Sequence, residues 1–291
     1  MREERHDTIL TARTSDPGAI ATAAAGRQRP TSLLGDHGRL MMIAADHSAR
    51  GMLGAGDRPM AMADRADLLD RLCLALSRPG VNGVLGTPDV IEDLLLLGAL
   101  EDKVVVGSMN RGGLAGSVFE LDDRFTAYDA AAVAGMGYQG GKMLLRIDPA
   151  DPASVRTLES CGRAVSELAG HGLLAMIEPF LARRFDGRVH NELTADAMIR
   201  AMTIAAGIGN TSAYSWLKVP IVPDMARVMA ATTLPAVILG GEVSADPDAA
   251  FEQWRAALAL PTVRGLVIGR SLLYPPDDDV AGAVDRAVSL F

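Results

Sequence analysis

The sequence predicts a (β/α)8 TIM barrel preceded by a short N-terminal arm. Eight short apolar runs recur along the chain, each ending in polar residues or glycine, and stretches with helical spacing lie between them. Apolar strands that alternate with helices are typical of a parallel sheet covered on both faces. Eight such repeats within 291 residues fit one closed barrel, which commonly takes about 250 residues. An open, doubly wound sheet is the alternative.

The predicted arm covers residues 1–38, and the predicted barrel covers residues 39–291. The arm is rich in Arg, Ala, Thr and Gly and has weak periodicity. We therefore expect it to be frayed, with one helix around residues 17–26, and to carry no chemistry. The eight predicted strands cover residues 39–46, 83–87, 103–110, 141–148, 173–179, 214–220, 235–241 and 263–269.

Several of the stretches between these strands carry clear helix signals. Their apolar residues recur every three or four positions, and several open with Thr, Asp or Pro, as helix N-termini do. The clearest predicted helices cover residues 63–77, 87–100, 151–170 and 246–260.

Composition and motifs disfavour several classes of function. The first predicted strand continues as AADHSARGMLG, which lacks the G-x-G-x-x-G turn of dinucleotide-binding folds, and the chain has no G-x-x-x-x-G-K-[ST] loop for nucleoside triphosphates. The net charge of −8 and the scarcity of lysine leave no basic stripe for nucleic acid. A small anionic substrate stays compatible, because a few arginines in one cleft outweigh the net charge locally.

The cysteines and the hydropathy pattern indicate a cytoplasmic protein. Cys73 and Cys161 lie in helical segments and not at the spacing of metal ligands. The sequence shows no secretory leader, and its apolar runs are far shorter than the roughly 20 residues that cross a bilayer. We expect a soluble protein with no membrane partner.

Lysine is rare in this chain, and its positions are informative. Lys103, Lys142 and Lys218 are the only lysines, against 25 arginines. Lys142 and Lys218 lie in runs that are predicted to be buried strands, where an unpaired ammonium is costly and tends to lose its proton. A neutral amine is a nucleophile, whereas a guanidinium is not. The ordinary alternative for Lys218 is a stem that covers apolar surface, and Lys103 is predicted to be a solvated charge.

Polar residues end the predicted strands, where a barrel builds its active site. Side chains from alternate strands share a layer, so Lys142 on the fourth strand and Lys218 on the sixth are predicted to face each other. Their mutual repulsion favours the neutral amine that attacks a ketone. The candidate site residues are Asp46, Asn110, Lys142, Arg146, Glu178, Lys218, Gly240, Gly241, Gly269 and Arg270.

Four short motifs, AADH, GGKMLL, IEP and WLKVP, resemble in their order the class I, Schiff-base aldolases of the deoxyribose-phosphate and tagatose-bisphosphate aldolase type. The resemblance extends over about residues 39–275. It implies that Lys218 forms the Schiff base and that Glu178 is the acid/base carboxylate. It also implies that Lys142 is the second lysine and that Asp46 orients substrate hydroxyls or shuttles protons.

Two glycine-containing turns, LGGEVS and VIGRS, resemble the phosphate-binding turns of the same family. The resemblance implies that backbone N–H groups of Gly240, Gly241 and Gly269, together with the Arg270 side chain, hold a phosphate.

Arg146 departs from the family, which often has an aromatic residue after the fourth-strand lysine. It is predicted either to meet a second anionic group, as is Arg111, or to be a rim arginine. The long loop of residues 108–124, which contains Arg111, is predicted to be a lid or a rim insertion.

A zinc-dependent class II aldolase is the main rival mechanism. It needs several His or acidic ligands that converge on one point. Only His47 and His190 are predicted near the mouth, and His47 has an alternative as a loop residue hydrogen-bonded beside Asp46. We therefore expect no metal and no other cofactor, because the lysine iminium serves as the electron sink.

The sequence thus predicts a class I aldolase acting on a phosphorylated keto-sugar or keto-sugar acid. A resemblance to an actinobacterial group associated with inositol breakdown implies 2-deoxy-5-keto-gluconate 6-phosphate as the substrate, giving dihydroxyacetone phosphate and malonate semialdehyde. A phosphate-binding isomerase or synthase without an imine and a non-catalytic sugar-phosphate sensor are the alternatives. We also expect a homo-oligomer.

Overall fold

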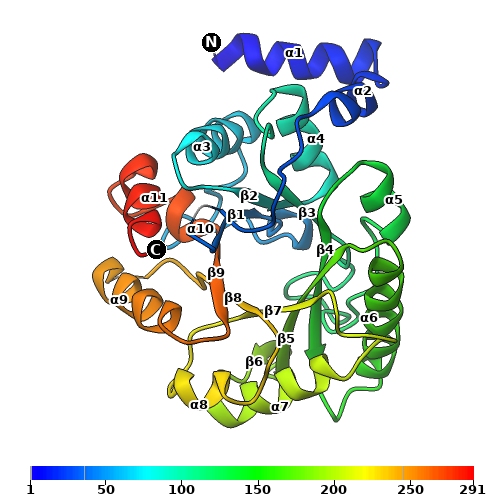
Figure 1. Cartoon of the computed structure of the whole chain (residues 1–291), viewed down its shortest axis with the longest axis vertical. Coiled ribbons are helices and arrows are strands. Elements are labelled where there is room, and N and C mark those ends of the chain that lie inside the picture. Colours follow the sequence, from blue (N-terminus) through cyan, green and yellow to red (C-terminus); the bar gives the residue numbers. More distant parts are fainter. Residues whose placement is uncertain (1, 36, 245) are drawn as a thin grey trace.

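Eight parallel strands close into a barrel in the computed structural model, which describes residues 2–35, 37–244 and 246–291 (Figure 1). Neighbouring strands follow one another around the ring, and the pairings of β4 with β5 and of β9 with β1 complete it. The predicted (β/α)8 fold is confirmed, and an open sheet is excluded. The strands of the ring are β1 (Leu40–Ala45), β2 (Gly83–Gly86), β3 (Val104–Ser108), β4 (Gly140–Ile147), β5 (Leu174–Phe185), β7 (Ser215–Val219), β8 (Ala236–Leu239) and β9 (Val263–Ile268).

Helices cover the outside of the ring, and α3, α4, α6 and α9 are the four that their start signals predict. Side chains cap several of them: the Asp246 carboxylate, for example, accepts from the Ala249 N–H at 3.0 Å. No helix within the described ranges combines the length and the apolarity that a bilayer crossing requires. The helices are α1 (Arg2–Ser15), α2 (Ala19–Gly26), the short 3-10 helix η1 (Ser48–Arg50), α3 (Arg65–Ser77), α4 (Pro88–Leu96), α5 (Ala130–Gly135), α6 (Ala153–Gly170), α7 (Ala195–Ala206), α8 (Met225–Met229), α9 (Pro247–Leu258), α10 (Arg270–Leu273) and α11 (Val280–Val288).

The N-terminal segment contains two helices where the sequence indicates one. α1 and α2 lie beside α4 at one end of the molecule (Figure 1). Arg13 donates to the Asp93 carboxylate of α4 at 2.7 Å, and the buried Arg27 donates to three backbone carbonyls. The frayed arm is therefore a wrong prediction for these helices. These polar contacts, together with Ile9 and Ala24, which are buried in the core, attach them to the barrel. Residues 1 and 36 of the predicted arm lie outside the described residues.

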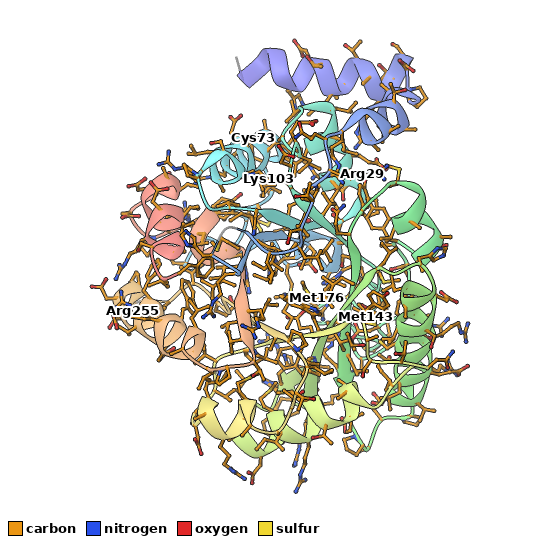
Figure 2. All side chains as sticks on the ribbon, in the orientation of Figure 1. Arg29, Cys73, Lys103, Met143, Met176 and Arg255 are labelled. Carbon is orange, nitrogen blue, oxygen red and sulfur yellow. The ribbon has the colours of Figure 1, made fainter. Side chains whose placement is uncertain are left out.

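Alternation along the strands divides the core into an inner and an outer layer. On β1, Met42 faces the barrel axis and Ile43 faces the helices. In Figure 2, Met176 lies at the centre of the barrel and Met143 lies toward α6. The apolar inner layer ends where the strands reach their carboxyl ends, so the polar side chains there lie directly above a packed apolar layer.

The β5 strand runs well past the barrel, beyond its predicted end at residue 179. Its extension pairs antiparallel with β6 (Arg188–Asn191) through a turn at Asp186 and Gly187, which have φ values of 48° and 73°. Two positive φ values at an Asp-Gly pair are the signature of a two-residue hairpin turn. The hairpin brings Phe180 and Asn191 to the rim of the central pocket.

Candidate active site

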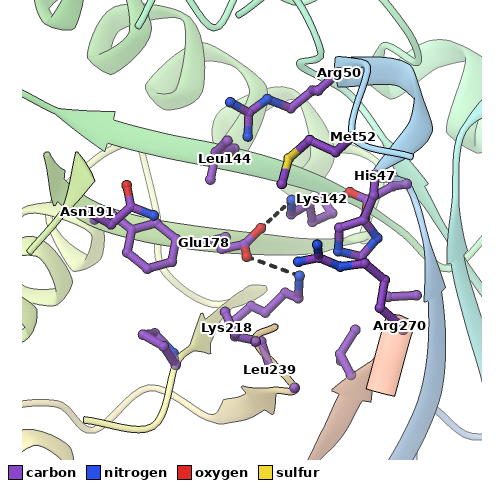
Figure 3. Close-up of a pocket in the computed structure, with 18 of the residues that line it drawn as sticks. His47, Arg50, Met52, Lys142, Leu144, Glu178, Asn191, Lys218, Leu239 and Arg270 are labelled. Atoms are coloured by element: carbon purple, nitrogen blue, oxygen red, sulfur yellow. Dashed lines mark hydrogen bonds and ion pairs between the residues drawn. The ribbon is translucent and has the colours of Figure 1, made fainter. Parts of the chain in front are cut away.

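A cavity of about 250 Å³ opens at the carboxyl ends of the barrel strands (Figure 3). Cationic side chains outnumber carboxylates in its lining, which suits an anionic ligand. The cationic side chains are Arg50, Arg111, Lys142, Arg146, Lys218 and Arg270, and the carboxylates are Asp46, Glu178 and Glu242.

Glu178 joins the two strand lysines at the base of this cavity. Its Oε1 accepts from Lys218 Nζ at 3.1 Å, and its Oε2 forms an ion pair with Lys142 Nζ (Figure 3). Lys142 lies on the fourth strand of the ring and Lys218 on the sixth, with Glu178 on the strand between them. The two lysines of alternate strands therefore converge on one carboxylate, which lies on the strand between them.

Asp46, at the end of β1, extends the chain of alternating charges. Its Oδ2 accepts from Lys142 Nζ at 3.2 Å, from Ser108 Oγ at 3.3 Å and from the Arg111 guanidinium. Arg111 also donates from Nε to Ser108 Oγ at 2.7 Å. Arg111 lines the cavity and forms a buried ion pair with Asp46, and its predicted contact with an anionic group of the substrate stays a prediction.

The pKa values of these groups follow from burial and neighbouring charge. Burial opposes the ionisation of Glu178, yet Lys142 and Lys218 lower its pKa to about 2. Burial opposes the ionisation of Asp46 too, but Arg111 and Lys142 hold its pKa well below the usual value. Burial, followed by the repulsion of Arg111, lowers the pKa of Lys142 to about 8. At neutral pH both carboxylates are therefore ionised.

His47 lies in the pocket lining next to Asp46, and its Nδ1 is 4.0 Å from Asp46 Oδ1. That separation is too long for a hydrogen bond, so the predicted hydrogen bond is not formed. Burial lowers the pKa of His47 to about 3, which leaves the ring neutral at physiological pH. His190 is exposed on β6. Among the described residues, no three His, Cys, Asp or Glu side chains are grouped to hold a metal ion.

The predicted phosphate-binding residues line the part of the pocket formed after strands β8 and β9. Gly240, Gly241, Gly269 and Arg270 all line the cavity. Both Arg270 Nη atoms donate to the Glu242 carboxylate at 2.7 Å, and this carboxylate side chain is 72% exposed. An exposed carboxylate therefore occupies the bidentate face of the buried arginine, where an anion of a ligand would also bind.

Asn110 and Lys103 are the residues whose surroundings differ most from the prediction. Asn110 does not line the cavity, because its Nδ2 donates to the Leu144 carbonyl at 2.6 Å and its Oδ1 accepts from the Leu144 N–H at 2.7 Å. The amide therefore joins β3 to β4 and has no polar atom left for a substrate. Lys103 is partly buried and donates to the Val81 carbonyl at 2.6 Å, so it is not a solvated charge.

Comparison with known proteins identifies the family. Residues 38–288 match the Cgl0159-like family. The crystal structure of Cgl0159 from Corynebacterium glutamicum has 50% sequence identity and a TM-score of 0.96, and the match covers 99% of this chain and 96% of that chain. The chain belongs to the Cgl0159-like family. No curated protein matches its sequence.

Two aldolase structures share the fold of this Cgl0159-like protein. An archaeal fructose 1,6-bisphosphate aldolase has 16% identity and a TM-score of 0.66, and the match covers 93% of this chain and 98% of that chain. A Schiff-base-forming fructose-1,6-bisphosphate aldolase has 15% identity and a TM-score of 0.63, with 93% and 99% covered. At such identities the likeness shows the barrel fold alone. The narrower resemblances to other aldolase types and to inositol breakdown stay predictions.

The Cgl0159-like barrel also contains a pocket arginine that sequence reasoning missed. Arg50, in η1, lines the cavity, and Figure 3 shows its guanidinium above Leu144. Its Nε donates to the Gly113 carbonyl of the loop of residues 108–124 at 2.8 Å. Because Arg50 follows the first strand at the same edge as Asp46, its position in the βα loop was the available signal.

Proposed function

We propose that this Cgl0159-like protein is a class I aldolase that makes or breaks a C–C bond in a phosphorylated keto-sugar or keto-sugar acid. The observation that supports this most strongly is the buried series Lys218–Glu178–Lys142–Asp46 at the base of a cation-rich pocket. Buried charges are costly, so such a series is easier to explain by chemistry than by stability. The shared fold of the Schiff-base aldolases is consistent with it.

Lys218 is the proposed nucleophile because, among the residues that the structure describes, it has one carboxylate partner, whereas Lys142 is held between two. Glu178, ionised and 3.1 Å from Lys218 Nζ, accepts a proton from it. The free amine adds to the substrate ketone, and the carbinolamine hydroxyl leaves as water with the proton that Glu178 had accepted, which leaves an iminium on Lys218 and an ionised Glu178. Lys142 stabilises the carbinolamine oxygen as a fixed, pre-oriented cation.

Cleavage then follows from the iminium acting as an electron sink. Glu178, with Asp46 as its relay through Lys142, takes the proton from the hydroxyl on the carbon to be detached. The C–C bond breaks, an aldehyde leaves, and its bonding electrons form an enamine on Lys218. Protonation of the enamine carbon and addition of water release the ketone product and restore the amine.

Borohydride trapping tests this proposal. Dihydroxyacetone phosphate and borohydride together should add one reduced ligand mass to the peptide that carries SWLKVP, and borohydride alone should add nothing. A chelator should not change the result. An isomerase, a synthase or a sensor that acts without an imine would bind the phosphate and give no adduct, and that outcome would end the proposal. An adduct on Lys142 would exchange the roles of the two lysines.

The pKa of Lys142 predicts one limb of the pH profile. If its ammonium stabilises the carbinolamine, activity should fall as the pH rises through about 8, where Lys142 loses its proton. Lys142→Arg keeps a cation at higher pH, so its smaller activity should show no decline near pH 8. The measurement is kcat between pH 6 and 10 for both proteins. An unchanged alkaline limb in Lys142→Arg would assign that limb to another group.

Arg270→Ala should weaken the phosphate site selectively. A bidentate charged pair is worth about 10- to 100-fold in affinity. The concentration of dihydroxyacetone phosphate that half-saturates trapping should rise by that factor, and that of dihydroxyacetone should barely change. Arg255→Ala is the matched control, because Arg255 forms an exposed ion pair with Glu252 on α9. Equal weakening of both ligands by Arg270→Ala would show that this arginine does not read the phosphate.

A further inference from the structure

Two further arginines, Arg50 and Arg146, lie on the pocket wall away from Arg270. Arg50 and Arg146 both line the cavity, and they are only 8% and 3% exposed. Arg146 lies four residues beyond Lys142 on β4, roughly 13 Å further along the strand. A ligand must therefore extend past the layer of the lysines to reach this pair.

The two arginines are held in different ways. Asp123, which is fully buried, accepts from Nε and Nη2 of Arg146 at 2.8 Å each, and this bidentate contact fixes Arg146 in place. The Glu120 Oε1 atom lies 3.2 Å from Arg146 Nη1 and 3.5 Å from Arg50 Nη2, so one oxygen is shared loosely between two guanidinium groups. The Glu120 carboxylate thus forms the weaker of the two carboxylate contacts to Arg146. Its other oxygen accepts from the Gly116 N–H at 2.9 Å, and the Glu120 main-chain carbonyl accepts from Arg146 Nη2.

Arg50 is the less well compensated cation. Within the described part of the chain, Glu120 is the carboxylate that the Arg50 guanidinium approaches within 4 Å, and the one shorter polar contact of this side chain is with the Gly113 carbonyl. Burial, followed by the repulsion of Arg146, lowers the pKa of Arg50 to about 10, which still leaves it charged at neutral pH. Asp123 and Glu120 both stabilise the charge of Arg50, but Asp123 is more than 4 Å away and Glu120 is shared with Arg146, so the guanidinium has no carboxylate of its own and is suited to accept an anion.

We infer that Arg50 and Arg146 form a second anion subsite, which binds a terminal carboxylate of the substrate when that carboxylate replaces Glu120 between them. The group to be replaced is a single carboxylate, so the subsite matches a carboxylate in size and charge. The inference deepens the proposed function and rests on it for one point, the binding of the substrate phosphate at the Arg270 end. The substrate class is then a phosphorylated keto-sugar acid.

Two ligands without a ketone test the subsite separately from imine chemistry. 6-Phosphogluconate and glucitol 6-phosphate have the same six-carbon chain and the same phosphate, but only the first ends in a carboxylate. Calorimetric titration of the full chain should give a dissociation constant for 6-phosphogluconate about 10- to 100-fold lower, which is the range of a charged hydrogen bond. A ratio near one would overturn the inference, even if trapping on Lys218 succeeds.

Substitutions of Arg50 and of Glu120 should change the ratio of the two dissociation constants, glucitol 6-phosphate over 6-phosphogluconate, in opposite directions. Arg50→Gln should bring it close to one while leaving the affinity for glucitol 6-phosphate nearly unchanged, which also reports that the pocket is folded. Glu120→Gln removes the competing charge and should increase the ratio several-fold. Arg124→Gln is the matched control on the same loop, since Arg124 is 63% exposed and paired with Asp122, and it should leave the ratio unchanged.

Other outcomes are equally decisive. If Arg50→Gln weakens both ligands equally, or if Glu120→Gln lowers the ratio, the cluster is a structural tie of the loop and the inference fails. If trapping on Lys218 fails but the ratio responds as expected, the subsite stands and the aldolase proposal falls.

Discussion

Lys218→Arg is expected to lower kcat/KM on the order of 10⁴-fold or more, because an enzyme that loses its covalent nucleophile keeps only binding and electrostatic assistance. The guanidinium preserves the positive charge next to Glu178, 3.1 Å away in the native protein, but it cannot form an iminium. The measurements are the rate of C–C cleavage and the mass of the trapped peptide. Both should be lost together.

The interpretation of this variant depends on its fold. Lys218 is 4% exposed in a packed strand, so the larger head group of arginine could destabilise the fold by over-packing the space around it. Lys218→Met offers a second variant of similar length without charge. Thermal unfolding and binding of 6-phosphogluconate should show whether the pocket survives in either one. Full activity in a folded Lys218→Arg protein would refute the Schiff-base mechanism.

Glu178→Gln is expected to lower kcat about 10²- to 10⁴-fold, the range of a lost general base. The iminium should still form, so borohydride should still label Lys218 with dihydroxyacetone phosphate, although more slowly. This separation of trapping from turnover distinguishes a base that acts on the hydroxyl proton from a residue that only supports the fold. Loss of labelling with retained folding would instead mean that iminium formation cannot proceed without the proton transfer from Lys218 to Glu178.

The same substitution should destabilise the protein, since it leaves Lys142 and Lys218 without the carboxylate between them. Removing one partner from a buried ion pair costs about 3–5 kcal/mol. The pKa of Glu178 is lowered from 4.5 to about 2 in the folded protein, so its stabilising effect is complete above pH 4.5 and is lost as the pH falls toward 2. Urea unfolding at pH 7 and at pH 3 should therefore show a smaller difference between native protein and variant at pH 3.

Local patterns were sufficient to locate the strands and the residues at their ends. Apolar runs of four to eight residues determine where each strand of the ring lies, and the change to polar residues marks its carboxyl end. Parallel strands in a closed barrel all present that end at one mouth, so Asp46, Glu178 and the two strand lysines could be grouped before any contact was known. The rarity of lysine added a chemical reason to single them out.

Local patterns failed where few apolar residues are buried and polar contacts over long sequence separations add to them. α1 buries Ile9 in the core and is also attached through Arg13, which donates to α4 across 80 positions of the sequence; one buried apolar residue in α1 is too weak a pattern to predict the helix. The Asp186-Gly187 pair is a sequence signal from which the β5–β6 hairpin could have been predicted. It was missed because the apolar run of β5 ends before this pair.

The partner of each charge was decided only by the tertiary structure. Arg270 is paired with Glu242, Arg111 with Asp46, and Arg146 with Asp123, across 28, 65 and 23 positions of the sequence. Electrostatic energy depends on distance and on the local dielectric, and both are set by how the loops meet after the ring closes. The sequence therefore determines which charged groups reach the mouth of this barrel, whereas closure determines which of them neutralise one another and which stay available to a substrate.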